Sequence, residues 1–294
     1  MQRFHRPLNP SYKECSKQFK ARWRCNVVGF KHMLAMGLLT AACLHTAAAQ
    51  DPVSTVIRMA ANEKAARVTR NHFIFLSKEK STRTNNQLWT ERVVETDDGP
   101  LRRLLRIDGR PLTPDESSAE DRRLQAIANN PDDFRRLNES SKDDEAHLLG
   151  LLSNLPTAFV LTPAGRDGDC TRFTFKPNPS FQPSGMEQRV IHVMEGTVSL
   201  KEPEDRLCLL QARIAQPVAF GFGIFGRINE GGNFTVERHL VNDHDWKTLH
   251  MAVHLDGKIL MMKTLARDQE TQRSDVRVVP LHIPLQQAVD LSKQ

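Results

Sequence analysis

The stretch Met194–Ile214, MEGTVSLKEPEDRLCLLQARI, decides the class of fold. It reads as two strands separated by KEPED, a run of turn-forming residues. A connection this short joins antiparallel neighbours, whereas parallel strands need a crossover of about a dozen residues or more. The stretch therefore predicts an antiparallel sheet rather than βαβ units.

The segments on either side of this stretch repeat the pattern. Further strands are predicted in AFVLTPAG, CTRFTFKPNP, NFTVERHLV, TLHMAVHLDGKILMMKTLARD and SDVRVVP. RLCLLQARI, KILMMKTLA and RVIHVM carry apolar residues on both faces, which predicts a sheet that is covered at least in part on both sides. We expect helices on one face, and a cavity or a second part of a curved sheet on the other.

The preceding half of the chain combines helices and strands. We predict a helix over residues 52–69, a strand in HFIFLSKEKSTR, and a hairpin of QLWTERVVET and LRRLLRID around DDGP. Charges dominate residues 115–155, which predicts a helical insertion broken near Asn130–Pro131 and stopped at Pro156. IPLQQAVDLSKQ predicts a short closing helix. The expected fold class is α+β, a curved antiparallel sheet packed on helices in a single domain over residues 50–294.

Residues 1–49 have the features of an export signal with an over-long basic leader. A basic region precedes the apolar run MLAMGLLTAAC, and Ala47 and Ala49 fit an A-x-A cleavage site. The apolar run is too short to span a membrane as a helix. We expect an exported protein that is periplasmic or associated with the outer membrane. A mitochondrial presequence and a lipoprotein signal ending at Cys43 are the alternatives.

The positive charge of the sequence belongs to this leader. The formal net charge is +6, but residues 1–49 hold eight of the 41 basic residues and one of the 35 acidic residues. The remainder is close to neutral and shows no basic face, so we expect no nucleic-acid partner.

Two cysteines, Cys170 and Cys208, lie beyond the leader. In an oxidising compartment they are able to form one disulfide, and two separate buried thiols are the alternative. Neither lies in a local context that indicates an activated nucleophile.

The stretch GFGIFG, residues 221–226, matches the letters of a dinucleotide-binding motif. That motif needs a helix that begins at its third glycine and holds the pyrophosphate at its N-terminus. Only four residues follow before Gly231–Gly232, where a helix is unfavourable, and the next segment predicts a strand. We therefore expect no nucleotide partner, and we interpret the segment as an apolar connection that caps a core or lines the mouth of a cavity.

Candidate metal-binding and catalytic residues give weak signals. His239, His244, His250 and His254 fall within sixteen residues. On a strand, His250 and His254 share a face but lie about 13 Å apart, which is too far for two ligands of one zinc ion. The sequence contains no G-x-S-x-G motif. We expect no metal, no cofactor and no catalytic residue, and therefore a protein that is not an enzyme.

Several phrases resemble a group of exported, uncharacterised bacterial envelope proteins: RIDGRPLTPDESSAEDRRL, FTFKPNPSF, MEGTVSLKEPEDRLCLLQARI, PVAFGFGIFGRINEGGNFTVERHLV and DWKTLHMAVHLDGKILMMKTLARD. The layout is similar to that of the outer-membrane lipoprotein carrier and sorting proteins, the LolA/LolB-like fold, over residues 51–280. The resemblance implies an incomplete antiparallel barrel wrapped over helices, with an apolar cavity. No motif here matches the functional residues of the carriers.

Together these features predict a non-enzymatic binding protein of the bacterial envelope. Its sheet would hold an apolar ligand, a lipid or a lipoprotein acyl chain, by removing alkyl groups from water at about 0.8 kcal/mol per CH₂. The residues expected to line or gate this site are Phe220, Phe222, Ile224, Phe225, Met261 and Met262. The alternative is a lipid-free protein-interaction or sensor module of the envelope, with another envelope protein as partner and the charged helices as contact surface.

Overall fold

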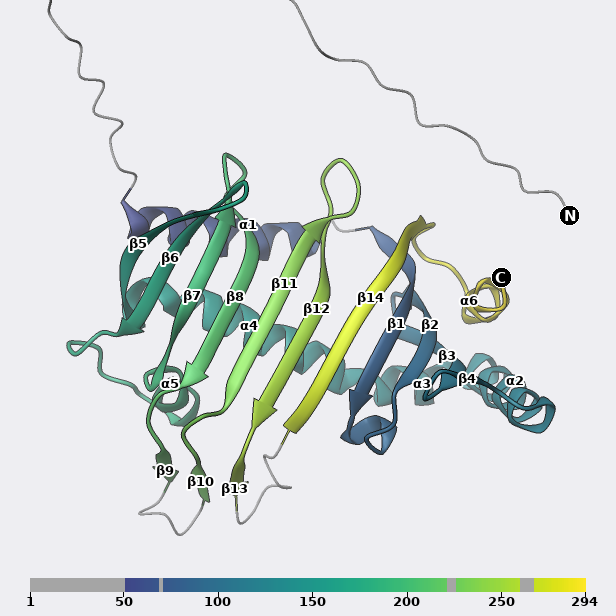
Figure 1. Cartoon of the computed structure of the whole chain (residues 1–294). Helices are drawn as coiled ribbons and strands as arrows, with labels where there is room; N and C mark the ends of the chain where they lie inside the picture. The colour runs from purple at the N-terminus through teal and green to yellow at the C-terminus, as the bar shows by residue number, and fades with distance from the viewer. Residues whose placement is uncertain (1–50, 69–70, 221–225, 260–266) are drawn as a thin grey trace, which may run out of the picture. The chain divides into compact units, whose positions relative to one another are not determined.

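The chain forms a large open antiparallel sheet with helices against it (Figure 1). The structure, a computed structural model, describes residues 51–68, 71–220, 226–259 and 267–294, with side chains throughout except at 139–147, 220, 226, 258–259 and 267. The predicted α+β class, a curved antiparallel sheet packed on helices, is confirmed.

Eleven strands of the described residues make the main sheet, in the spatial order β4-β3-β2-β1-β14-β12-β11-β8-β7-β6-β5. All neighbours pair antiparallel, and β4 and β5 are edge strands, so the sheet does not close into a barrel. The bounds are β1 His72–Ser81, β2 Trp89–Thr96, β3 Gly99–Ile107, β4 Arg110–Pro111, β5 Phe159–Asp167, β6 Cys170–Pro177, β7 Met194–Lys201, β8 Arg206–Ile214, β11 Asn233–Leu240, β12 Trp246–Leu255 and β14 Arg267–Val279. A second sheet contains β9 Val218–Phe220, β10 Gly226–Ile228 and β13 Gly257–Ile259.

Capping side chains mark the start of only some of the helices. The helices are α1 Pro52–Val68, the 3₁₀-helix η1 Thr82–Thr84, α2 Pro114–Asn129, α3 Pro131–Leu137, α4 Glu139–Ala158, α5 Met186–Ile191 and α6 Leu285–Ser292. Thr113 and Glu116 form a capping box at α2. Pro131 begins α3 directly after the end of α2, as predicted. None of the helices in the described ranges is both long and apolar enough to cross a membrane.

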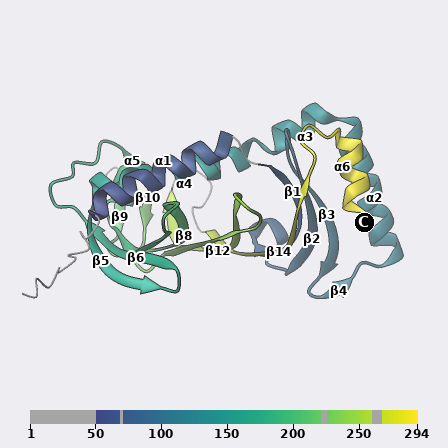
Figure 2. The ribbon, with the colours of Figure 1, turned by 90° about the horizontal axis from the view of Figure 1, so that it is seen from above.

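Helices cover opposite faces at the two ends of the sheet. One row of cross-strand neighbours runs through β8, β11, β12, β14 and β1: Leu210, Val236, Met251, Thr271 and Glu79. This face, called the inner face, packs against α1 and α4 at the β5–β8 end. Ile74 lies five residues from Glu79 on β1 and therefore points to the other, outer face, where it packs with α2, α3 and α6. Figure 2 shows α1 and α4 on one side of the curved sheet, and α2 and α6 beyond β3.

The two helix layers enclose separate apolar cores. The core under α1 and α4 includes Val56, Met59, Leu152, Leu155, Phe173, Phe175, Val198, Leu200, Leu207 and Leu210. The core under α2, α3 and α6 includes Ile74, Val94, Leu101, Leu124, Phe134, Ala288 and Val289. Burial of each large apolar side chain contributes about 1.5–3 kcal/mol. At each end of the sheet the helices thus cover one face, but the covered face differs between the two ends.

Two predicted elements also differ from the structure. The segment RVIHVM was predicted as a strand, but Met186–Ile191 form α5 and β7 begins only at Met194. The side chain of Gln188 accepts hydrogen bonds from the amide and hydroxyl of Ser184, which stabilises a helical turn there. The predicted stop of the helical insertion at Pro156 is also wrong: α4 continues to Ala158, which is fully buried in the core.

Candidate functional site

The side chains predicted to line or gate an apolar site lie outside the described residues: Phe220, Phe222, Ile224, Phe225, Met261 and Met262. Only the backbone of Phe220 is described, at the end of β9. Gly226, the third glycine of the dinucleotide-like motif, begins β10, which pairs with β9 and β13. The motif therefore opens a strand and not the helix that pyrophosphate binding requires.

The interface between the inner face and helices α1 and α4 is filled with side chains. Val56 and Met59 of α1 and Leu155 of α4 have no exposed surface. Below them, the rings of Phe159 and Phe175 meet edge to face with centroids 4.8 Å apart. The described part of this interface is therefore a packed core.

Glu63 of α1 is a buried carboxylate that connects three elements. It is 4% exposed and accepts hydrogen bonds from Arg206 Nε at 2.9 Å, from the Leu207 amide at 3.1 Å and from Arg238. Burial by itself raises the pKa of Glu63, but the positive charges of Arg238 and Arg206 and the hydrogen bonds outweigh it, so the pKa lies below its ordinary value. The ionised carboxylate thus attaches α1 to β8 and β11.

A second cluster of charges, in which the two carboxylates of Glu79 and Glu91 are buried, occupies the inner face of β1–β3. Arg83 Nη2 lies 2.9 Å from Glu79 Oε2 and 2.7 Å from Glu91 Oε2, and Arg102 Nη1 lies 3.2 Å from Glu91 Oε2. Burial raises the pKa of Glu79, but hydrogen bonds from Arg83 and Ser81 lower it further than burial raises it. This part of the inner face is occupied by ion pairs, so it does not provide the apolar lining that an acyl chain requires.

A large open groove lies on the outer side of the sheet. Its volume is about 1270 Å³. The floor consists of outer-face residues of β7, β8, β11 and β12: Ser199, Leu209, Gln211, Thr235, Glu237 and His250. The walls include the ends of the β5–β6, β7–β8 and β11–β12 hairpins, and one end reaches Asn62 and Ala65 on α1. We call this feature the hairpin groove.

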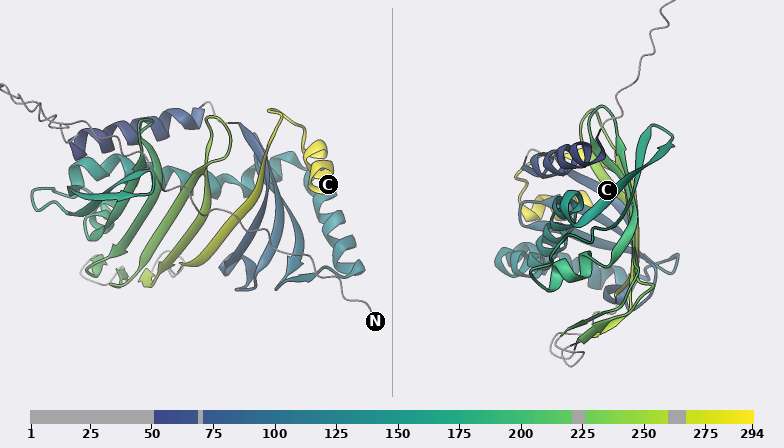
Figure 3. Two further views of the ribbon diagram at one scale, coloured as in Figure 1. Left: turned by 45° about the horizontal axis from the view of Figure 1, so that its top comes forward. Right: turned by 90° about the vertical axis from the view of Figure 1, so that its left-hand side faces the viewer.

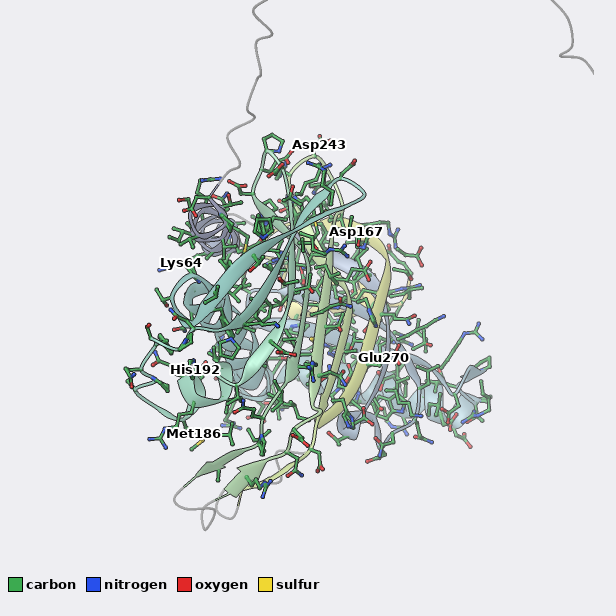
Figure 4. The ribbon with its side chains drawn as sticks, turned by 60° about the vertical axis from the view of Figure 1, so that its left-hand side comes forward. Lys64, Asp167, Met186, His192, Asp243 and Glu270 are labelled. Atoms are coloured by element: carbon green, nitrogen blue, oxygen red, sulfur yellow. A yellow bond between two sulfur atoms is a disulfide. The ribbon has the colours of Figure 1, made fainter. Side chains whose placement is uncertain are left out.

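The topology brings these three hairpin turns to the same end of the strands. Consecutive turns of an antiparallel meander alternate between the two ends of the strands, so the β5–β6 and β7–β8 turns lie at the same end. The chain passes through β9 and β10 at the opposite end before β11, and the β11–β12 turn therefore lies at the first end again (Figure 1). Figure 4 shows Asp167 and Asp243 at this end, and Met186 and His192 at the other. In the right-hand view of Figure 3 the sheet is seen edge-on, with the purple α1 against its inner face.

Each of the three turns contributes an exposed acid to the groove. Asp167 lies at the β5–β6 turn, Glu204 at the β7–β8 turn and Asp243 at the β11–β12 turn. All three are exposed. None of them forms an ion pair with another residue in the part of the chain that the structure describes. Their negative charges therefore face solvent in the groove.

The basic residues of the groove already have carboxylate partners. Lys201 Nζ lies 3.0 Å from Asp169 Oδ2, and its hydrogen bond lowers the pKa of Asp169. Arg206 and Arg238 both bind Glu63. Lys201 is matched by Asp169, whereas Arg206 and Arg238 share one carboxylate and leave one positive charge. The three exposed acids outweigh this charge, so the charge that remains in the groove is negative.

The floor of the groove also contains a buried hydroxyl group. Ser199 is 1% exposed, and its Oγ makes no hydrogen bond within the described residues. Cys170 and Cys208 belong to the same lining and form a disulfide with a sulfur–sulfur distance of 2.07 Å. This bond ties β6 to β8 across β7, which fixes the relative positions of two strands of the groove.

The histidines of this region lie beside carboxylates on the outer face, and His239 and His250 share Glu237. His239 Nε2 is 2.8 Å from Glu237 Oε1, His250 is within 3.8 Å of Glu237 and 3.7 Å of Glu270, and His254 is 3.8 Å from Asp268: these contacts spread along the outer face. His250 and His254 share this face, as their register with β14 shows. Among the described residues, no group of three His, Cys, Asp or Glu side chains is placed to hold one metal ion.

Sequence reasoning placed the contact surface on the charged helices and did not identify the three acids of the groove. The available signal was an acid in each of the turns RDGD, KEPED and NDHD. These turns alternate with others along the meander, so their position at the same end of the strands could be inferred once the strand order was known.

The fold is thus that of an α+β protein with an open antiparallel sheet and helices on both faces. No protein-family model and no curated protein matches the sequence. One similar solved structure is described as an outer-membrane lipoprotein-sorting protein domain from Vibrio parahaemolyticus; it has a TM-score of 0.30 and 9% identity, over 76% of this chain and 93% of that chain. Another is MucB in complex with MucA(peri), with a TM-score of 0.21 and 9% identity, over 77% of this chain and 94% of that chain. At these scores the likeness is a weak resemblance of fold.

Proposed function

We propose that this chain is a non-enzymatic binding protein of the bacterial envelope, and that the hairpin groove holds a segment of another envelope protein. The observation that best supports this proposal is the contrast between the two candidate sites. The described part of the sheet–helix interface is filled by side chains, whereas the groove is open and has polar walls. The proposal follows the second sequence-based hypothesis but places the contact on hairpin turns instead of charged helices.

The size and lining of the groove favour a polypeptide over a small apolar molecule. Its volume of about 1270 Å³ is larger than the roughly 300–1,000 Å³ that is typical of small-molecule pockets. Gln211 and Thr235 supply donors and acceptors on the floor, and Leu209 supplies apolar surface between them. Such a mixture suits the alternating polar and apolar groups of a peptide.

Site-specific photo-crosslinking in the native envelope tests the proposal. A photoreactive residue at Gln211 lies on the groove floor, and the same residue at Gln182, which is exposed and lies outside the groove, serves as the matched control. We expect a discrete protein adduct at Gln211 that is absent at Gln182. Equal adducts at both positions contradict the proposal. So does a native mass spectrum of the purified protein with a bound lipid and no adduct at Gln211, which favours the acyl-chain hypothesis.

A further inference from the structure

We infer that the partner segment in the hairpin groove is rich in lysine and arginine. This inference rests on the proposed function and names the chemistry of the partner. It starts from Asp167, Glu204 and Asp243, which are exposed at the three turns and make no ion pair within the described residues. The cations of the same lining do not neutralise them, because Lys201 already pairs with Asp169, and Arg206 and Arg238 together carry only one positive charge more than Glu63.

The neighbouring groups leave this negative charge in place. Arg166 is 3.4 Å from Glu202, and Arg58 is 2.6 Å from Asp205, so each of these pairs adds no net charge. Asp245, next to the β11–β12 turn, adds a further carboxylate, which hydrogen bonds from Asn242 and Asn71 stabilise. A potential of one sign over a hollowed surface attracts a segment of the opposite sign.

A second observation, independent of charge, also indicates a ligand. Ser199 lies in the groove floor with 1% of its surface exposed, and its hydroxyl has no hydrogen-bond partner in the described residues. An unpaired buried polar group has a cost in free energy that a partner group relieves. A peptide amide or side chain that enters between the turns supplies such a partner.

The spacing of the turns suggests the spacing of the basic residues. The β5–β6, β7–β8 and β11–β12 hairpins follow one another across the sheet, with two strands in each. At about 4.8 Å between strands, successive turns lie about 10 Å apart. A polyproline-type segment repeats every three residues over about 9.3 Å. A segment with a basic residue at every third position therefore matches the three acids.

Two labelled dodecapeptides provide the test: four repeats of Lys-Pro-Ala, and the same peptide with Glu in place of each Lys. Fluorescence anisotropy at low salt measures their binding to the protein. We expect the Lys peptide to bind with an affinity that falls as the salt concentration rises, and we expect the Glu peptide not to bind. Reversal of all three acids, Asp167→Lys with Glu204→Lys and Asp243→Lys, is expected to weaken the Lys peptide at least about tenfold, because three attractions become three repulsions.

A matched control variant distinguishes the effect of the three groove acids from the effect of the overall net charge of the protein. Asp115→Lys with Glu187→Lys and Asp290→Lys changes the net charge equally on three exposed residues outside the groove. We expect it to weaken the Lys peptide less than about twofold. Thermal unfolding monitors folding, and the neutral variant Asp167→Asn with Glu204→Gln and Asp243→Asn replaces the reversed one if the latter does not fold.

The inference is overturned if the Glu peptide binds as well as the Lys peptide, if no peptide binds, or if the matched variant weakens binding as much as the groove variant. In each of these cases, the crosslinking experiment at Gln211 tests the proposed function independently of the peptide-binding experiment. A crosslinked partner segment without basic residues leaves the binding function standing and removes only the basic partner. Loss of both the crosslink and the peptide binding removes both.

Discussion

Replacement of Glu63 by glutamine tests how the inner face is held together. Glutamine has nearly the same shape and keeps an acceptor for the Leu207 amide, but it removes the only charge that Arg206 and Arg238 share among their described carboxylate contacts. The side chains of these arginines are 11% and 15% exposed. The variant therefore leaves two cations side by side with little access to water.

The magnitude follows from this burial. Loss of one partner of a buried ion pair costs about 3–5 kcal/mol, and the retained acceptor places Glu63→Gln near about 3 kcal/mol. In a folded region of this size, each kcal/mol lowers Tm by about 2–4 °C. We expect a decrease of about 6–12 °C at pH 7.

The effect has a defined pH dependence. The pKa of Glu63 is lowered from its ordinary value of 4.5, so its stabilisation is fully present above the unfolded-state pKa and is lost as pH falls through the lower folded-state pKa. Glutamine does not titrate. The difference in the free energy of unfolding between wild type and Glu63→Gln is expected to be constant down to about pH 5 and to shrink below pH 4.5.

Urea unfolding at pH 7, 5 and 3, followed by circular dichroism, measures this difference. Asp169→Asn is the control, because it removes a carboxylate that is 85% exposed from a pair with Lys201; we expect little change in Tm. A loss of less than about 1 kcal/mol at pH 7, or a difference that is as large at pH 3 as at pH 7, would refute the reasoning.

Two further predictions concern β7 and its neighbours. A Cβ at Gly196 would lie 1.9 Å from the carbonyl oxygen of Gln211 on β8, so Gly196→Ala should lose at least about 1–3 kcal/mol; differential scanning calorimetry should show no comparable loss for Gly185→Ala, where no atom lies within 4 Å, and equal losses would contradict the clash. Cys170 and Cys208 are 38 residues apart, and a loop of this length predicts about 4 kcal/mol of stabilisation from the disulfide. Dithiothreitol should therefore lower the urea midpoint of the wild type but not of the double serine variant, and an unchanged wild-type midpoint would count against this role.

Much of the sheet could be predicted because the features that specify it involve residues close together in the sequence. The turn KEPED between two β-rich runs and the break at Asn130–Pro131 are properties of neighbouring residues, and both are found in the structure. The choice of face is different. A shift of one residue in register exchanges the two faces of a strand, and the register shifts at Ser199/Leu200 and Glu237/Arg238. No local pattern reveals such bulges, and none shows which distant helices pack on which face, so the division of the helices between the two faces was not predictable.

The groove depends even more on distant parts of the chain. Asp167 and Asp243 are separated by six intervening strands, and they lie at the same end of the strands only because β9 and β10 lie at the opposite end before β11 begins. The same applies to the partners of Glu63, which are more than 140 residues away: Arg206 by 143 and Arg238 by 175. The sequence shows that these residues are charged, but only the strand order shows which charges are matched and which remain free.

The disulfide between Cys170 and Cys208 has a consequence for the affinity of the groove. It joins strands on both sides of β7 directly at the groove, so a chain with reduced cysteines lacks this covalent link and relies there on backbone hydrogen bonds and core packing. Oxidation makes this part of the groove rigid and lowers the entropy lost when a partner is received. A chain with reduced cysteines is then expected to bind the proposed partner more weakly than the oxidised chain, so the affinity of the groove depends on the redox state of two residues in its lining.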